Sequence, residues 1–252
     1  MEQASDHLEC FSEENGYPIE IIEARQSLEG RPRVFERLLN WTMASGSELL
    51  WLCGPVSNES LSDISLSVAY IVLLSDQAKL PMISYRCRNE ELGLCGSRSN
   101  SSVAMDRLTV VVYSLIRQLV WLLSDPVETY SDLSAMRFGS LDANFETLID
   151  ALNLLDELLA LVPNVLICVI DGFQLIDNDT EVFEGTGGYL DVLLDILKKE
   201  REGRVLKVLL ASDGNCLSLS DERNVGLHEQ LHIMSGTSAE QQRSLAELQL
   251  IA

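Results

Sequence analysis

Gly54 follows an apolar run and precedes a helical segment, which is a local setting in which proteins bind phosphate. From Cys53 to Leu61 the order is strand end, glycine, polar loop and helix start. Backbone amides at such a helix start point toward an anion, and the pattern G-x-x-x-x-G-K-[ST] completes the site. Its lysine neutralises the β and γ phosphates of a nucleotide, and its hydroxyl binds magnesium. The chemistry to look for in this segment is therefore nucleotide binding and phosphoryl transfer.

Three of the four defining positions of this pattern differ when Gly54 is taken as its first glycine. Glu59 stands in place of the second glycine, where a side chain obstructs the approach of phosphate and adds negative charge. Ser60 replaces the lysine and brings no cation, and Leu61 replaces the hydroxyl residue and offers no oxygen to magnesium. The first lysine in the chain is Lys79, so no lysine within the loop takes over. We therefore expect these positions to be a vestigial nucleotide-binding site.

The start of the helix also matches a capping sequence. The segment 60–63 reads Ser-Leu-Ser-Asp, which fits the S-x-x-D/E capping box. It predicts that the Ser60 hydroxyl and the Asp63 carboxylate accept hydrogen bonds from the first free amides. The amides that would bind phosphate are then satisfied within the chain. We interpret the segment as a capped strand-to-helix turn rather than a working phosphate site.

Apolar runs that end at turn residues alternate with longer helical segments along the chain. Continuous apolar runs are typical of strands buried on both faces, and intervening helices indicate parallel connections. The sequence predicts an α/β fold, a three-layer parallel sheet with helices on both faces, whose ligands bind at the C-terminal strand ends. We expect strands at 48–53, 82–85, 165–170, 205–211 and near 231–233, and helices at 34–41, 61–80, 105–123, 145–162, 189–201 and from 239.

The charge of the chain restricts its partners. Eighteen Lys and Arg residues stand against 39 Asp and Glu residues, giving a formal net charge of −21. Nucleic-acid binding requires clustered cations that neutralise phosphates, so we expect no nucleic-acid partner. No apolar stretch has the length of a membrane span, and the opening residues lack a secretory signal. We expect a cytoplasmic protein without membrane contact.

Domain organisation follows from where the elements begin. We predict an acidic, partly ordered lead-in over residues 1–32 and one α/β domain over residues 33–252. The six cysteines form no C-x-x-C pair, so we expect reduced, mostly buried thiols. The three tryptophans lie on apolar faces, and we expect them in the core: Trp41, Trp51 and Trp121.

Four segments together resemble the nucleotide-binding domain of NACHT-type NTPases, the signal-transduction class known as STAND, especially those of filamentous fungi. A helix that ends near a tryptophan leads into Leu49-Leu50-Trp51-Leu52-Cys53-Gly54, similar to the family's L-L-W-I-x-G entry to the phosphate loop. Segment 114–119 resembles a family helix, 166–171 resembles the Walker B strand, and 207–212 resembles the sensor strand. The likeness covers residues 34–215 and implies a P-loop NTPase fold.

The resemblance also shows what this chain lacks. It implies that Asp171 is the first Walker B acid, which acts through magnesium, but Gln174 and Leu175 replace the acids that would activate water. The family's sensor strand ends in Ser-Arg, and here Ser212 is followed by Asp213. Phosphoryl transfer depends on positioning and charge neutralisation, so these losses together predict an inactive NTPase.

We therefore predict no catalytic residue, and a vestigial nucleotide site at Gly54, Glu59, Ser60, Leu61, Asp171 and Ser212. The predicted function is a protein-interaction or regulatory module with an unidentified protein partner and no cofactor. The alternative is a signalling domain that binds ATP or ADP weakly with Mg²⁺ but does not hydrolyse it. A true hydrolase is the third reading.

Other residues carry weaker chemistry. Asp177 and Asp179 could coordinate a cation, but solvated loop positions are the preferred interpretation, and we predict no metal site. His228 and His232 are four apart, yet their surroundings favour a strand or turn. Cys216 has no neighbouring base and is interpreted as a packing thiol. Arg86, at the end of the second strand, is expected to pair with a carboxylate.

Overall fold

One parallel sheet forms the centre of the molecule. The computed structural model describes residues 3–11, 32–57, 62–87, 103–123, 132–141, 145–177, 186–220 and 228–232. In these ranges five strands pair in the order β2-β3-β4-β1-β5, and every strand pair is parallel. The strands are β1 (Glu48–Gly54), β2 (Met82–Arg86), β3 (Val165–Asp171), β4 (Val205–Asp213) and β5 (His228–His232).

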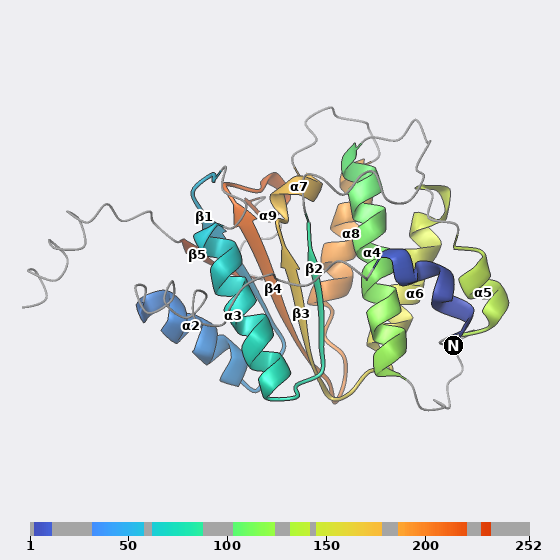
Figure 1. Cartoon of the computed structure of the whole chain (residues 1–252), viewed down its shortest axis with the longest axis horizontal. Coiled ribbons are helices and arrows are strands. Elements are labelled where there is room, and N and C mark those ends of the chain that lie inside the picture. Colours follow the sequence, from blue (N-terminus) through green and yellow to red (C-terminus); the bar gives the residue numbers. More distant parts are fainter. Residues whose placement is uncertain are drawn as a thin grey trace, which may run out of the picture.

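Helices cover both faces of this sheet. Figure 1 shows α2 (Pro32–Met43) and α3 (Asp63–Gln77) on one side and α4 (Val103–Leu122), α6 (Leu148–Leu159) and α8 (Thr186–Lys198) on the other. This arrangement confirms the predicted α/β fold, a three-layer parallel sheet with helices on both faces. The shorter elements are η1 (Gln3–Phe11), α5 (Ala135–Gly139), η3 (Phe145–Thr147), α7 (Gln174–Asp177) and α9 (Leu217–Ser220).

The apolar runs form strands because each has two faces to bury. Along β3, Cys168 and Ile170 pack into the large core under α4, α6 and α8, whereas Ile167 and Val169 pack into the core under α2 and α3. Successive side chains of a strand point to opposite faces, so a run without polar alternation fits a sheet covered on both sides. The fold class could be predicted from the sequence for this reason.

Helix α2 is held to the opening residue of β1 by charge. Glu48 pairs with Arg37 of α2 and lies 3.6 Å from Nζ of Lys207 on β4. The Lys207 side chain is 2% exposed, and burial lowers its pKa although Glu48 counteracts this. Trp41 Nε1 also donates a hydrogen bond of 3.2 Å to the Glu48 carbonyl. One carboxylate thus serves both the helix and the neighbouring strand.

The N-terminal helix η1 packs against α4. Its Leu8 is fully buried, and the ring of Phe11 stacks on Tyr113 with centroids 5.5 Å apart. The buried Arg117 of α4 donates to Ser5 Oγ at 2.6 Å and to Asp6 Oδ1 at 3.1 Å. This part of the lead-in is therefore packed on the domain, and the division at residue 32 stays a prediction.

Two sequence expectations are wrong in detail. Trp121 is 40% exposed rather than in the core, and the guanidinium of Arg117 lies 4.9 Å from its ring centroid. The second predicted helix, 61–80, is shorter, since α3 begins at Asp63 and ends at Gln77. The last predicted helix, from residue 239, lies outside the described residues.

Candidate functional site

The C-terminal ends of the strands bring the predicted site residues to one edge of the sheet. In the strand register, Gly54 of β1 lies opposite Asp213 of β4, and Arg86 of β2 lies opposite Asp171 of β3. Ser212 lies opposite Cys53. Of the six predicted positions, Gly54, Asp171 and Ser212 therefore share this edge. Residues 59–61, with Glu59, Ser60 and Leu61, lie outside the described residues.

Asp171 is buried and both of its carboxylate oxygens have partners. The residue is 2% exposed. Its Oδ2 lies 3.6 Å from Nε of Arg86, which is itself 8% exposed, and its Oδ1 accepts a hydrogen bond of 3.3 Å from Ser65 Oγ. A buried charge is stable only when paired, and Arg86 supplies that pair. The predicted ion pair of Arg86 with a carboxylate is confirmed, and its partner is the Walker B-like acid.

Helix α3 is capped, but not by the predicted residue. Ser62 is the N-cap, in extended conformation, and its Oγ accepts a hydrogen bond of 3.1 Å from the amide of Ser65. The capping box of Ser60 and Asp63 is thus wrong, because the helix starts two residues later than that pattern requires. Ser62 accepts a hydrogen bond from one of the first free amides of the helix. The predicted type of cap is therefore present, but at a different serine.

Ser212 serves the packing of the strand ends. Its Oγ accepts a 2.9 Å hydrogen bond from Trp51 Nε1 and donates one of 2.9 Å to the carbonyl of Gly214. The amide of Gly214 in turn donates to the Gly54 carbonyl at 2.8 Å. Ser212 is fully buried, so its hydroxyl is committed to this network. The hydroxyl that the resemblance assigned to a sensor thus links β4 to β1.

Gly172, directly after Asp171, occupies a position that requires glycine. Its φ is +77°, a conformation that side chains disfavour. A Cβ at this position would lie 2.8 Å from the carbonyl oxygen of Cys87. The Cys87 amide also donates to the Asp171 carbonyl at 2.8 Å. The chain after β2 therefore lies directly against the end of β3, which keeps Arg86 beside Asp171.

The residues that replace the missing acids and the sensor arginine have structural contacts. Gln174 Oε1 accepts a hydrogen bond of 3.1 Å from the Asp213 amide, and so joins the ends of β3 and β4. Asp177 accepts from the Ser218 amide at 3.1 Å and from its hydroxyl. The solvated-loop interpretation of Asp177 is thus wrong, since this carboxylate holds the start of α9. Asp179 lies outside the described residues.

The carboxyl group of Asp213 is partly buried at this edge, and burial destabilises its ionised form. Burial raises its pKa above the usual 3.8, and the nearby Asp63 adds to that, although Ser62 and Arg86 lower it. Its Oδ1 is buried and has no hydrogen-bond donor among the described residues. Because the folded pKa is the higher one, the stabilisation from Asp213 is present below its unfolded pKa and is lost as pH rises through the folded value.

We therefore predict that Asp213→Asn stabilises the protein at neutral pH. The variant removes the buried charge and keeps an acceptor for Ser62. Urea unfolding should give a higher midpoint than the native chain at about pH 7, and the difference should shrink toward about pH 4. A lower midpoint at about pH 7 would show that the charge itself is needed there.

The Cys216 thiol near this edge is buried. Cys216 is fully buried, and burial raises its pKa to about 12, so it is a neutral packing thiol at physiological pH, as expected. The cysteines in the described ranges form no disulfide with one another. His228 and His232 fall on strand β5, in agreement with the strand interpretation.

No three His, Cys, Asp or Glu side chains of the described residues lie together in a way that could hold a metal ion. In the described part of the chain, no helix combines the length and the apolar character that crossing a bilayer requires.

Comparison with known proteins shows only distant structural likeness. The fold is similar to the ORC2 protein of Aeropyrum pernix in its ADPNP–ADP complexes, at 16% identity and a TM-score of 0.47 over 94% of this chain and 54% of that one. For the ADP form the values are 15%, 0.41, 95% and 55%. This chain thus spans about half the length of ORC2, and no function is transferred at this similarity. Neither a protein-family model nor a curated protein matches the sequence.

Sequence reasoning missed two of the residues that define this edge. Ser65 contacts Asp171 across 106 positions of the chain, and Trp51 contacts Ser212 across 161. The one local signal for Ser65 is that it stands three residues after Ser62, where a capping serine finds its amide partner. No local signal exists for the indole of Trp51, because its partner is set by strand order.

Proposed function

We propose that this chain is a P-loop NTPase-like domain, of the NACHT type that its sequence resembles, that does not hydrolyse nucleotide. In this proposal it serves as a protein-interaction or regulatory module in the cytoplasm. The observation that carries the proposal is the buried pair of Arg86 and Asp171. The acid that would act through magnesium is bound within the chain to a guanidinium and a hydroxyl.

The contacts of Asp171 support a site that takes no magnesium-bound nucleotide. Magnesium prefers oxygen ligands in octahedral geometry, and a guanidinium beside the carboxylate repels the cation. Asp171 Oδ2 faces Arg86 at 3.6 Å and Oδ1 faces Ser65 at 3.3 Å. Binding of a cation here would separate Arg86 from Asp171 and cost the buried ion pair. That cost supports a site that stays closed to the metal.

The remaining catalytic roles are also unfilled. Gln174, at the position of a water-activating acid, is bound to the Asp213 amide. Asp213 places a carboxyl group where the resemblance would put the sensor arginine, and so repels a γ-phosphate. Catalysis of phosphoryl transfer depends on charge neutralisation, and this edge supplies the opposite sign.

The second candidate is nucleotide binding without hydrolysis. One observation favours it: Ser65 places a hydroxyl 3.3 Å from Asp171 within the first turn of α3. A hydroxyl and an acid near a helix start are two of the groups that a nucleotide site uses. This candidate requires Arg86 to leave Asp171 when the nucleotide binds.

A thermal shift separates the two candidates. The purified chain is heated with MgADP or MgATP at millimolar concentration, with MgCl₂ alone as the control. The inactive module predicts an unchanged melting temperature. A nucleotide binder predicts a rise of several degrees, because a ligand at about 100 times Kd stabilises the native state by about 2.7 kcal/mol. A rise that Ser65→Ala abolishes would establish the second candidate and overturn the first.

A further inference from the structure

The N-terminal helix η1 covers a surface that other elements of the domain build. Figure 1 shows η1, in dark blue beside the N label, lying across α4 and next to α5. The side of α4 below it carries Tyr113, Arg117 and Trp121, which are four residues apart and therefore share one face of the helix. The carbonyl of Leu141, just after α5, borders this face and lies 3.1 Å from His7 Nε2. We call these residues of α4, with Leu141, the docking face.

η1 meets the docking face with residues that are three positions apart. Ser5, Leu8 and Phe11 are its buried residues, and residues at this spacing lie on one side of a 3-10 helix. The ring of Phe11 stacks on Tyr113, and Leu8 is fully buried. The small side chain of Ser5 lies against Arg117, whose Nη1 donates to its hydroxyl at 2.6 Å. The docking face thus accepts a small, an aliphatic and an aromatic residue in one row.

A second row of η1 brings negative charge to Arg117. Asp6 and Glu9 are also three residues apart, and their carboxylate oxygens lie 3.1 and 3.5 Å from Arg117 Nη2. The Arg117 side chain is 3% exposed, whereas both acids are about half-exposed. A buried guanidinium is stable when anions pair with it, and here η1 supplies two of them. The docking face therefore favours a segment whose acids stand next to its apolar row.

The way in which η1 is attached is typical of a bound segment. Among the described residues, no hydrogen bond between main-chain groups joins residues 3–11 to the rest of the domain. Side chains make the attachment. A 3-10 helix of nine residues is also longer than such helices usually are, because their hydrogen-bond geometry is poor. η1 thus depends on the docking face for its conformation, as a segment does that orders on binding.

The docking face continues past η1. Trp121 is 40% exposed with η1 in place, and the Arg117 guanidinium lies 4.9 Å from its ring centroid. Because Phe11 lies at Tyr113 and Ser5 lies at Arg117, the Trp121 end continues beyond the Ser5 end of η1. A segment with an apolar residue three positions before the small residue would cover the indole. Such a segment gains a contact that η1 does not make.

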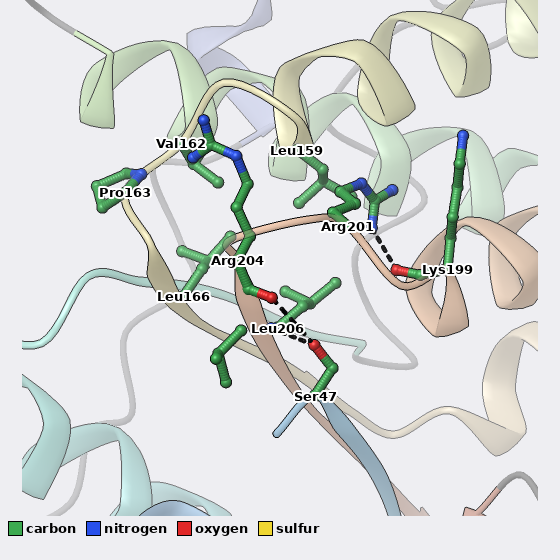
Figure 2. A pocket seen from close by; sticks show the side chains of 10 residues that line it. Ser47, Leu159, Val162, Pro163, Leu166, Lys199, Arg201, Arg204 and Leu206 are labelled. Atoms are coloured by element: carbon green, nitrogen blue, oxygen red, sulfur yellow. Dashed lines mark hydrogen bonds between the residues drawn. The ribbon is translucent and has the colours of Figure 1, made fainter. Parts of the chain in front are cut away.

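The hollow at the starts of β3 and β4 is too small to be an alternative. Figure 2 shows Lys199, Arg201 and Arg204 around it. It encloses about 10 Å³, the room of one water molecule. Lys199 and Arg201 are both paired with Asp156 at 2.6 Å. These cations therefore stabilise the domain, and the hollow has no room for a partner's side chain.

We propose that the docking face of α4 binds a helical segment of a protein partner, and that η1 occupies the same face as a competing ligand within the chain. The partner segment carries a small, an aliphatic and an aromatic residue at spacings of three, with an acid directly after each of the first two. A second copy of this chain is the poorer occupant, because two chains of net charge −21 repel each other. This inference deepens the proposed interaction function and rests on it for the class of partner.

Binding of a separate peptide by the full chain tests this proposal. The probe is a fluorescent peptide with the sequence of residues 1–12, with serine in place of Cys10, and its anisotropy is followed. The native chain should bind it weakly. Leu8→Asp in the chain should tighten binding at least about tenfold, because it removes a tethered competitor of about millimolar effective concentration. Arg117→Met added to Leu8→Asp should weaken binding about tenfold or more, whereas Arg33→Met, at an exposed arginine of α2, should not.

Two changes in the peptide test the recognition pattern. Asparagine and glutamine in place of Asp6 and Glu9 should weaken its binding to the Leu8→Asp chain at least about tenfold. Leucine in place of Glu2 should tighten binding, and Trp121→Ala in the chain should abolish that gain. Unchanged affinity of the first peptide would contradict recognition of the acids by Arg117. Unchanged affinity of the second would contradict the extension of the docking face to the indole.

The remaining outcomes also decide the proposal. Equal affinity of the native and Leu8→Asp chains, or no binding to either, would overturn it. A native chain that is a dimer in solution, and a monomer with Leu8→Asp, would show exchange of η1 between copies in place of a partner. Loss of peptide binding would leave the prediction on nucleotide hydrolysis untouched, because phosphate release is measured separately.

Hydrogen exchange of the native chain gives a second measurement if Leu8→Asp does not fold. The amides of η1 should exchange through an opening that leaves the amides of β3 protected. Exchange of both only on global unfolding would make η1 an integral part of the fold and overturn the proposal.

Discussion

Replacing Arg86 with alanine is expected to lower the free energy of unfolding by about 3–5 kcal/mol, because removing one partner leaves a buried charge without compensation. The carboxylate of Asp171 is 2% exposed; it would keep the hydrogen bond from Ser65 but lose the guanidinium beside it. Urea unfolding followed by far-UV circular dichroism measures this difference.

Two further variants test whether the loss of stability comes from breaking the ion pair rather than from any change of an arginine to alanine. The double variant Arg86→Met with Asp171→Leu removes both charges and should recover most of the loss, since an apolar pair of similar volume replaces a buried ion pair at little cost. Arg33→Ala, at an exposed arginine, should change the free energy of unfolding by less than about 0.5 kcal/mol. If Arg86→Ala matched Arg33→Ala, the pair would not be what closes the site.

Trp51→Ala is expected to cost about 3–5 kcal/mol, the range for removal of a fully buried aromatic side chain. Trp51 lies in the centre of β1 and is fully buried, and its indole also holds Ser212. Trp51→Phe keeps most of the volume and should lose only about 1 kcal/mol, the net value of one hydrogen bond. Both are measured by the same urea titration.

The matched control is Trp121→Ala. Its side chain is 40% exposed and rests on Arg117, so its loss should cost about 1 kcal/mol or less. Similar losses for Trp121→Ala and Trp51→Ala would contradict the conclusion that burial and the hydrogen bond to Ser212 make Trp51 the more important of the two side chains for stability.

The fold could be predicted because its strands are apolar on both faces. The run of β3 is continuous from Leu166 to Ile170, and no other layer arrangement buries such a strand as well. The order of strands could not be predicted, because β4 lies between β1 and β3 through pairings more than 35 residues apart in sequence. The exposure of Trp121 could not be predicted either, because the helical period places this residue beside buried positions.

Features of the site that depend on the type of a single residue could be predicted from the sequence. Features that depend on contacts between residues distant in the chain could not. The replacement of lysine by Ser60 and the place of Asp171 at a strand end are visible in the sequence. The hydrogen bonds that close the site join residues from different strands and helices. Ser65 donates a hydrogen bond to Asp171, a role that the sequence analysis assigned to no residue. Gln174 stands where a water-activating acid was expected and instead accepts from the Asp213 amide.

The pairing of Asp171 with Arg86 gives the acid at this strand end a structural role. The acid that a nucleotide site would use through a metal is retained, and a guanidinium of the neighbouring strand compensates its charge. The hydroxyl at the end of β4 is likewise retained in Ser212 and bonded to Trp51. The polar groups of the edge now stabilise the strand ends.

Phosphate release from MgATP by the purified chain tests the central claim most directly. The native protein and Asp171→Ala are compared in the same preparation, so that a contaminating hydrolase contributes equally to both. The closed pair of Arg86 and Asp171 predicts equal rates at the level of buffer alone. Turnover by the native chain that disappears in Asp171→Ala would contradict the claim and identify a working NTPase.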